Sequence, residues 1–98
     1  MKIIWSPLSL QKLEYYADYI AQDNVDAALV FIDEVEESAL SLKDFPFKGR
    51  MIPALNDELK RELIIKSNYL LLYEIHEDRV EILTIRHVRQ DHNKFFKP

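Results

Sequence analysis

The sequence predicts an α+β fold, in which a pair of helices covers one face of a mainly antiparallel β-sheet. Three features of the chain carry this prediction. A short β-type run comes first, from Lys2 to Trp5, and two segments with helical apolar spacing follow it. Three apolar runs joined by tight turns then occupy residues 59–86. Helices and strands that are segregated along a chain in this way are typical of α+β domains.

The first helix is predicted to begin at Ser6-Pro7. A serine side chain can accept a hydrogen bond from the free N–H groups at a helix start, and proline at the first helical position loses no bond that the helix would make. Apolar residues then recur at three- and four-residue spacing, which predicts one apolar stripe. They are Leu10, Leu13, Tyr16, Ala17, Ile20 and Ala21.

The second helix is predicted to follow Asp23-Asn24, which interrupts the first pattern and can cap a new helix. Because only a couple of residues separate two helices of similar length, we expect an antiparallel helical hairpin with one apolar face. The apolar stripe of the second helix consists of Ala28, Phe31, Ile32, Val35, Ala39 and Leu42.

The connection between the helices and the sheet begins at Phe45-Pro46, since proline disfavours helical geometry at the residue before it. Gly49 is the only glycine of the chain, and we expect it at a turn position that requires a positive φ. Residues 50–53 are predicted to form a short edge strand, because Pro53 is tolerated only at an edge or at the end of a strand.

Three consecutive strands are predicted to complete the sheet as a meander. The middle run, YLLLYEI, is apolar at nearly every position, which indicates a central strand covered on much of both faces. Two-residue turns are expected at Ser67-Asn68 and Glu77-Asp78. The predicted strands are Leu59 to Lys66, Tyr69 to Ile75 and Val80 to Arg86.

Length and composition are those of an ordinary folded protein, and we expect a single domain over residues 1–98. There is no cysteine, which excludes disulfides, thiolate metal sites and a cysteine nucleophile. The N-terminal apolar run is broken by Ser6 and Pro7, and no stretch approaches the roughly 20 apolar residues of a membrane span. We therefore expect no signal peptide, no contact with membranes and a cytoplasmic location.

Charge is distributed unevenly along the chain, although the net charge is only −4. Up to Phe45, three lysines stand against nine acidic residues, whereas the remainder has ten basic and eight acidic residues. Nucleic-acid-binding proteins usually carry a basic field over the whole domain. This chain has none, so contact with a polyanion would have to be local.

The motif content excludes several classes of chemistry. One glycine cannot build a phosphate-binding loop, which excludes nucleotide hydrolysis and dinucleotide redox chemistry. The three histidines, His76, His87 and His92, do not have the spacing of a metal site. The sequence therefore predicts neither a metal ion nor a cofactor.

Basic residues at the start and the end of the meander are the candidates for a functional site. If the meander brings its first and last ends to one rim of the sheet, these cations cluster there. A histidine among arginines could act as general acid or base, with the arginines stabilising a phosphorane-like transition state. Such a set would suit a ribonuclease that needs no metal. The residues are Lys60, Arg61, Lys66, Arg86, His87 and Arg89.

A simpler interpretation of the same residues stays open. The arginines at 61, 86 and 89 would then be surface charges paired with Glu62, Glu81 and Asp91, and His87 would pack at a strand end. On the sequence alone this interpretation is favoured over a catalytic site.

Tyrosines offer a second possible binding surface. Tyr69 and Tyr73 are four residues apart in one strand and so share a face, while Tyr15, Tyr16 and Tyr19 crowd the first helix. Proteins stack unpaired bases on such rings. Tyrosine at a half-buried interface is the commoner reason for this pattern.

Several short patterns, taken together, resemble the RelE/ParE superfamily of bacterial toxin–antitoxin toxins. The match extends from Ile3 to about Gln90 and rests on the order and spacing of its pieces. These are Trp5-Ser6-Pro7 before an amphipathic helix, Phe45-Pro46 with Gly49-Arg50-Met51-Ile52-Pro53, Arg61-Glu62-Leu63, Tyr69 with Tyr73, and Val80, Ile82, Leu83, Ile85, His87 and Arg89.

The resemblance implies a toxin with the predicted fold, neutralised by a cognate antitoxin that wraps it in a hetero-oligomer. It also implies one of two targets. RelE-like members cleave messenger RNA on the ribosome with basic residues, which here would be Arg61, His87 and Arg89. ParE-like members, known from plasmid stabilisation systems, inhibit DNA gyrase and lack the nuclease residues. A member that has lost toxicity and acts as a binding partner or co-repressor is a third possibility.

The basic set of the RelE-like members is incomplete in this sequence. Leu63, Leu70 and Gln90 stand where that group has basic residues. We therefore favour the ParE-like branch, with no catalytic residue assigned and growth arrest through gyrase. The role of the Phe95-Phe96 tail is not assigned. The candidates for binding the target or partner are Arg50, Arg61, Tyr69, Tyr73, Arg86, His87 and Arg89.

Overall fold

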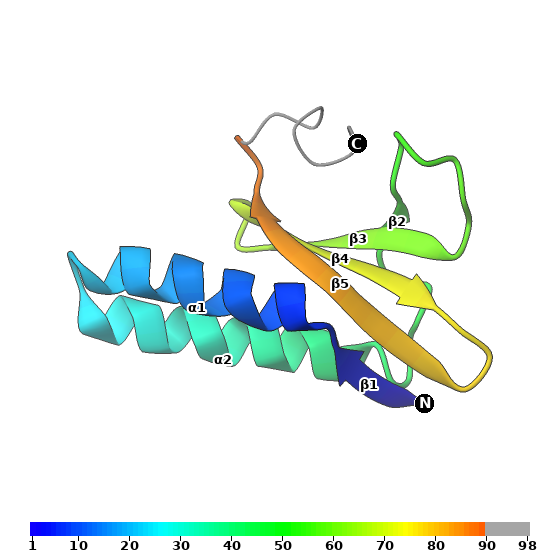
Figure 1. The fold of residues 1–98 in the computed structure, drawn as a ribbon, viewed down its shortest axis with the longest axis horizontal. Coiled ribbons are helices and arrows are strands. Elements are labelled where there is room, and N and C mark those ends of the chain that lie inside the picture. The colour runs from blue at the N-terminus through cyan, green and yellow to red at the C-terminus, as the bar shows by residue number, and fades with distance from the viewer. Residues whose placement is uncertain (90–98) are drawn as a thin grey trace.

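The structure is a computed structural model, which describes residues 1–89. One strand is followed by two helices and four further strands, in the predicted order (Figure 1). The predicted α+β fold is therefore confirmed, whereas the Phe95-Phe96 tail lies outside the described residues. The elements are β1 (Lys2–Trp5), α1 (Pro7–Ala21), α2 (Val25–Ser41), β2 (Arg50–Met51), β3 (Lys60–Ile65), β4 (Tyr69–Ile75) and β5 (Arg79–His87).

The five strands form one sheet in the order β1-β5-β4-β3-β2. β1 runs parallel to β5, and all other neighbouring strands are antiparallel. β4 is the central strand and is apolar on both faces, as predicted. Leu71, Tyr73 and Ile75 belong to the main core, whereas Leu70 and Leu72 pack with Ile52 in a small second cluster.

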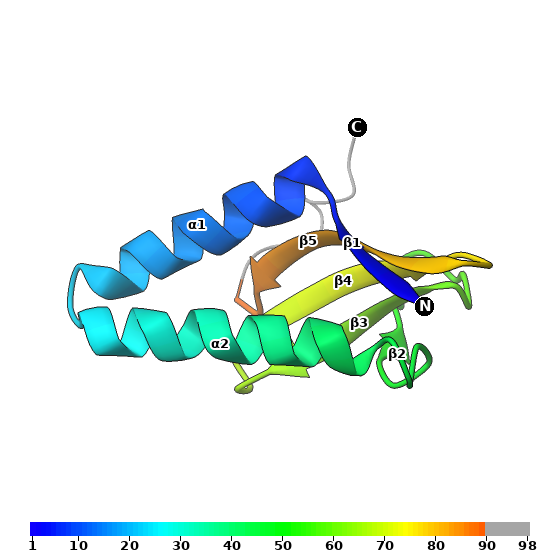
Figure 2. The ribbon, with the colours of Figure 1, turned by 90° about the horizontal axis from the view of Figure 1, so that it is seen from below.

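The two helices lie side by side on one face of the sheet, with α1 against β5 and α2 against β3 (Figure 2). Their apolar stripes enter the main core through Tyr16 and Ala17 of α1 and through Phe31 and Val35 of α2. Full burial of a side chain such as that of Phe31 or Val35 contributes roughly 1.5–3 kcal/mol to folding. The helices thus rest on the sheet through most of the residues that the periodicity selects, whereas Leu10, which was predicted in the stripe of the first helix, is 51% exposed. Among residues 1–89, neither helix is long and apolar enough to cross a membrane.

Both predicted helix starts are confirmed. The Ser6 hydroxyl oxygen accepts a hydrogen bond from the Ser9 N–H at 3.0 Å and donates one to the Leu83 carbonyl at 2.8 Å. The cap of α1 therefore also fastens the helix to β5. Asn24 Oδ1 accepts a hydrogen bond from the Ala27 N–H at 3.0 Å and caps α2.

Two predicted details of the turns are wrong. Gly49 does not have a positive φ, and the residues of the described chain that do are Asn56, Lys66 and Ser67. β3 ends at Ile65, so the turn before β4 has three residues, two of them left-handed, instead of two. The extra turn residue is Lys66, which the sequence pattern assigns to the strand.

Candidate functional site

The predicted cluster of basic residues at one rim of the sheet is not formed. β3 and β5 both run antiparallel to β4, so the start of β3 and the end of β5 lie at opposite ends of the sheet. Arg61 is level with Tyr73, whereas His87 is level with Tyr69. Four strand residues correspond to about 13 Å along the strand direction. The seven candidate residues therefore occupy three separate places.

The first place is the Gly49 anchor, which we define as Gly49, Arg61 and Tyr73 with the carbonyl of Pro46. The Tyr73 hydroxyl donates to the Pro46 carbonyl at 2.7 Å and accepts from the Gly49 N–H at 2.9 Å. Arg61 Nε donates to the Gly49 carbonyl at 2.8 Å, and its Nη1 donates to the Glu58 carbonyl at 2.8 Å. Arg61 and Tyr73 thus hold the chain between α2 and β2 against the sheet.

The close approach at this anchor explains the chain's only glycine. A Cβ atom added at Gly49 would lie 2.5 Å from the Glu62 carbonyl oxygen and 2.8 Å from the Tyr73 hydroxyl oxygen. Burial raises the pKa of the Tyr73 phenol above its ordinary value, and the hydrogen bond from Gly49 and the charge of Arg61 act in the opposite direction. The anchor is therefore packed too closely to admit a ligand.

Arg50 lies next to the anchor, at the edge strand β2. Its Nη2 is 2.7 Å from Glu62 Oε2, and its Nε donates to the same oxygen at 2.8 Å. Glu62 therefore pairs with Arg50 and not with Arg61, which corrects the pairing expected from the sequence. The Glu62 side chain is fully buried while that of Arg50 is 62% exposed, so Arg50 presents a charge to solvent beside the anchor.

The second place is the sheet face opposite the helices, where Arg86 lies. Arg86 is level with Leu70 of β4, whose side chain belongs to the small cluster on that face. Arg86 is only 1% exposed. Its Nη1 donates to the His87 carbonyl at 3.4 Å. The expected pair with Glu81 is not formed, since Glu81 is level with Glu74 and Arg86 with Leu70, and the Glu81 carboxylate contacts His76. Arg86 is not accessible to a partner in this arrangement.

The third place is a groove where α1 meets the ends of β4 and β5, which we call the tyrosine groove. It has a volume of about 320 Å³, and its tyrosine rings meet edge to face. Tyr69 and His87 also meet edge to face, with 5.0 Å between their ring centroids. Burial is the main cause that raises the pKa of Tyr69, and the neighbouring Tyr19 phenol raises it further. The groove is lined by Tyr15, Tyr16, Tyr19, Tyr69, His87 and Arg89.

His87 is held in a defined orientation within the tyrosine groove. Its backbone N–H donates to the Tyr16 hydroxyl oxygen at 3.2 Å, and its ring Nδ1 accepts from the Arg89 backbone N–H at 3.1 Å. A ring nitrogen that accepts a hydrogen bond carries no proton, so the proton of the neutral ring lies on Nε2. Arg89 also lines this groove, and its side chain is exposed to solvent. Because the groove combines an oriented histidine with an accessible cation, it is the best-formed candidate site.

The structure thus brings together three of the seven predicted residues, Tyr69, His87 and Arg89, and adds three tyrosines of α1. The crowding of these tyrosines is visible in the sequence. Nothing in their spacing indicates that they face the end of β5, because that contact depends on how α1 crosses the sheet. Tyr73, which the sequence groups with Tyr69, lies on the same face but is fully buried in the anchor.

The family assignment rests on a match that covers nearly the whole chain. The model of the ParE toxin of the type II toxin–antitoxin system parDE matches residues 3–92. The chain belongs to this family. It is a type II toxin of the ParE/RelE superfamily, and membership implies a cognate antitoxin as partner.

Individual relatives agree with this family. The chain is 30% identical over 86 residues to Toxin RelE2 of Caulobacter vibrioides, an alignment that covers 88% of this chain and 93% of the relative. The fold is similar to that of the chromosomal ParDE toxin–antitoxin system from P. aeruginosa, with a TM-score of 0.74 and 19% identity over 91% of this chain and 97% of that one. A YoeB/ParE toxin from Agrobacterium tumefaciens gives a TM-score of 0.63 at 15% identity, with coverages of 89% and 98%.

Proposed function

We propose that this toxin arrests growth by binding DNA gyrase and does not cleave RNA, and that its cognate antitoxin neutralises it. The observation that carries the proposal is the separation of the basic residues. Arg61 is used to hold the Gly49 anchor, Arg86 is buried on the opposite face, and Arg89 is the one of these three arginines that lines the groove with His87. The match to the ParE family supports the same choice.

The separation matters because RNA cleavage without a metal depends on convergent charges. Preorganised cations must lie where negative charge develops on the phosphate, and each such donor contributes about 3–4 kcal/mol to stabilising the transition state. A cation about 13 Å away along the sheet cannot serve this role. The single exposed arginine of the tyrosine groove is better suited to binding a protein surface, where arginine and tyrosine are common hot-spot residues.

The overall charge supports a protein target as well. A protein that docks on ribosomal RNA gains much of its affinity from contacts between cations and phosphates. This chain has a net charge of −4, so a long-range field would repel a polyanion. Contact with a protein subunit of gyrase requires no such field.

The proposal is tested with purified toxin in a gyrase supercoiling assay, alongside a second assay for gyrase-linked DNA breaks. We expect loss of supercoiling or accumulation of breaks in proportion to toxin concentration, and recovery when the cognate antitoxin is added. A folded toxin that is inactive in both assays would contradict the proposal. Overexpression that leaves cells unharmed in the absence of antitoxin would contradict it too.

An alternative function is a ribosome-dependent endoribonuclease, favoured by the 30% identity to a relative named Toxin RelE2. In that case His87 would act from the tyrosine groove, with base stacking on Tyr69 and charge stabilisation by Arg89, whereas Arg61 would contribute only through the anchor. Mapping the ends of translated messages after induction separates the two functions. Cleavage within codons supports the alternative, and growth arrest with intact messages excludes it.

A further inference from the structure

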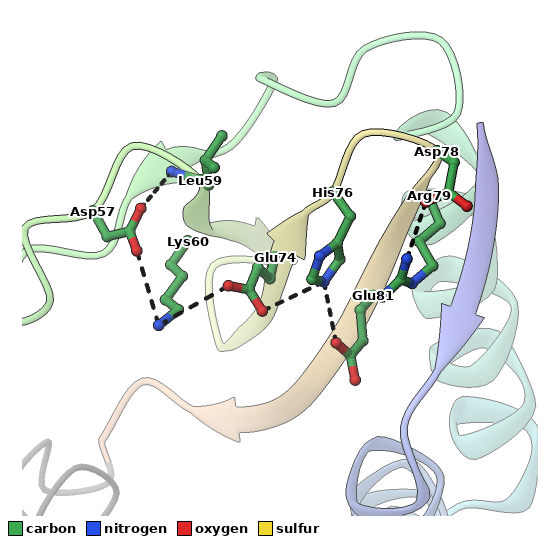
Figure 3. A network of polar contacts seen from close by, with 8 residues as sticks. All are labelled: Asp57, Leu59, Lys60, Glu74, His76, Asp78, Arg79 and Glu81. Carbon is green, nitrogen blue, oxygen red and sulfur yellow. Dashed lines mark hydrogen bonds and ion pairs between the residues drawn. The ribbon is translucent and has the colours of Figure 1, made fainter.

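A cluster of one histidine and two glutamates lies at the tip of the β4–β5 hairpin, at the other end of β5 from the tyrosine groove (Figure 3). Glu74 lies near the end of β4, His76 directly follows that strand, and Glu81 lies near the start of β5. One ligand atom from each of the three residues lies within 4.8 Å of the others. Figure 3 shows the His76 ring directed at both carboxylates, with Lys60 on the far side of Glu74.

We propose that Glu74, His76 and Glu81 form a binding site for a divalent transition-metal ion of the Zn²⁺ type. Imidazole nitrogen and carboxylate oxygen are ligands that Zn²⁺ prefers, and three protein ligands leave a fourth position for water. The sequence alone does not indicate this site, because spacing between histidines takes no account of carboxylates on a neighbouring strand. The inference goes beyond the proposed toxin function and does not depend on it.

The two distances from the histidine to the carboxylates are those of weak hydrogen bonds and also suit ligands of one metal ion. His76 Nε2 lies 3.3 Å from Glu81 Oε1 and 3.4 Å from Glu74 Oε1. Zinc bonds of about 2.0–2.2 Å place neighbouring ligands of a tetrahedron about 3.3–3.6 Å apart. A charge-assisted hydrogen bond between a protonated histidine and a carboxylate would be shorter, at about 2.7–2.9 Å.

The charges around the cluster also call for a cation. Glu74 and Glu81 are direct partners across β4 and β5, and like charges in this position destabilise a sheet. Lys60 is 4.0 Å from Glu74 Oε2 and 3.8 Å from Asp57 Oδ2, so it interacts with the Glu74 oxygen that does not face His76. This one lysine balances only one of the three carboxylates of Asp57, Glu74 and Glu81.

The backbone fixes the three ligands before an ion arrives. Glu74 and Glu81 sit in paired strands, and Glu81 is also level with Ile4 of the parallel strand β1. The His76 N–H donates to the Arg79 carbonyl at 2.8 Å, which closes the hairpin turn. The three side chains are between 27% and 35% exposed, so an ion can enter from solvent without opening the core.

The test uses the full chain without an affinity tag, freed of metal by chelation and titrated with Zn²⁺ in a calorimeter. We expect one ion per chain and an affinity about 100-fold lower in His76→Gln and in Glu81→Gln. Glu77→Gln removes a carboxylate from the same turn without removing a ligand, and it should bind like the parent. Circular dichroism confirms that each variant is folded.

A second measurement separates a metal site from a histidine that bridges two carboxylates. Zn²⁺ at one hundred times its dissociation constant should raise the melting temperature of the parent by roughly 10 °C and leave that of Glu81→Gln unchanged. In chelator, Glu81→Gln should melt no lower than the parent, because it relieves the repulsion between the glutamates. Absence of saturable binding, equal affinity in His76→Gln, or a marked loss of stability of Glu81→Gln in chelator would each overturn the proposal.

Discussion

The Gly49 anchor and the tyrosine groove lie at opposite ends of the same sheet, and the sequence presents them as similar. Each combines one arginine with one tyrosine of β4: Arg61 with Tyr73 in the anchor, and Arg89 with Tyr69 in the groove. In the anchor, Arg61 and Tyr73 interact with each other and make hydrogen bonds to the backbone of residues 46, 49 and 58, and Tyr73 is fully buried. In the groove, Tyr69 is only partly buried and Arg89 is exposed. Position along the sheet therefore decides whether a cation supports the fold or meets a partner.

The physical cause of the difference is what lies opposite each end. The chain between α2 and β2 crosses the anchor and brings backbone groups that need hydrogen bonds, because buried N–H and C=O groups without partners are costly. The groove end faces the side of α1, with Phe31 of α2 packed against Tyr69. The Tyr16 hydroxyl and the His87 ring accept hydrogen bonds from backbone N–H groups there, whereas the Arg89 side chain is exposed and can meet another molecule.

The largest loss of stability should come from Gly49→Ala, which tests how closely the anchor is packed. The added Cβ would meet the Glu62 carbonyl oxygen at 2.5 Å, and this oxygen belongs to a sheet strand that cannot move without breaking its pairing. We expect the free energy of unfolding to fall by about 3 kcal/mol, as for overpacked cores. Urea unfolding followed by circular dichroism measures the change.

The matched control for this substitution is Asp44→Ala, at an exposed position just upstream in the same connection. It should change the free energy of unfolding by less than about 0.5 kcal/mol. If Gly49→Ala is as stable as the control, the anchor is looser than the structure indicates, and the role of Arg61 as a structural residue is wrong.

The next effect contrasts the two tyrosines of β4. Tyr73→Phe removes the bond to the Pro46 carbonyl and leaves the Gly49 N–H without its partner, so we expect a loss of about 2 kcal/mol. Tyr69→Phe keeps the ring in the groove and should change stability by less than about 0.5 kcal/mol. Equal losses in both variants would contradict the division into anchor and groove.

The dependence of stability on alkaline pH provides a second test of the burial of Tyr73. Burial raises the pKa of Tyr73 in the folded chain, while the unfolded chain titrates near the ordinary value of about 10. The stabilisation is therefore complete below about pH 10 and is lost as the pH rises toward the folded-state pKa, with a slope of at most about 1.4 kcal/mol per pH unit. Tyr73→Phe should reduce this slope, which stability curves between pH 8 and 11 would measure. An unchanged slope would contradict the role of burial.

Local signals in the sequence were sufficient for the elements but not for the site. Helix caps at Ser6 and Asn24 and the apolar run of β4 depend on residues close in the chain, and the structure confirms all three. The predicted rim of cations is wrong because β3 and β5 run in the same direction, which places Arg61 and His87 at opposite ends of the sheet. The sequence predicts Gly49 at a turn, whereas glycine is required there because the Glu62 carbonyl and the Tyr73 hydroxyl approach it closely from other parts of the chain.

The smallest effect on stability should accompany the largest effect on function, at Arg89→Gln. The Arg89 backbone N–H, which orients the His87 ring, is unchanged by this substitution, so the free energy of unfolding should change by less than about 0.5 kcal/mol. Growth inhibition after induction without antitoxin should fall at least tenfold, since an arginine at the centre of a binding surface contributes about 2 kcal/mol or more. The matched control is Arg79→Gln, which removes an exposed arginine paired with Asp78 at the far end of the β4–β5 hairpin. The toxin with this substitution should inhibit growth as the parent does. If Arg89→Gln inhibits growth as strongly as Arg79→Gln, the tyrosine groove is not the surface that meets the target. The comparison holds whether that target is gyrase or the ribosome, because both functions place Arg89 at the contact.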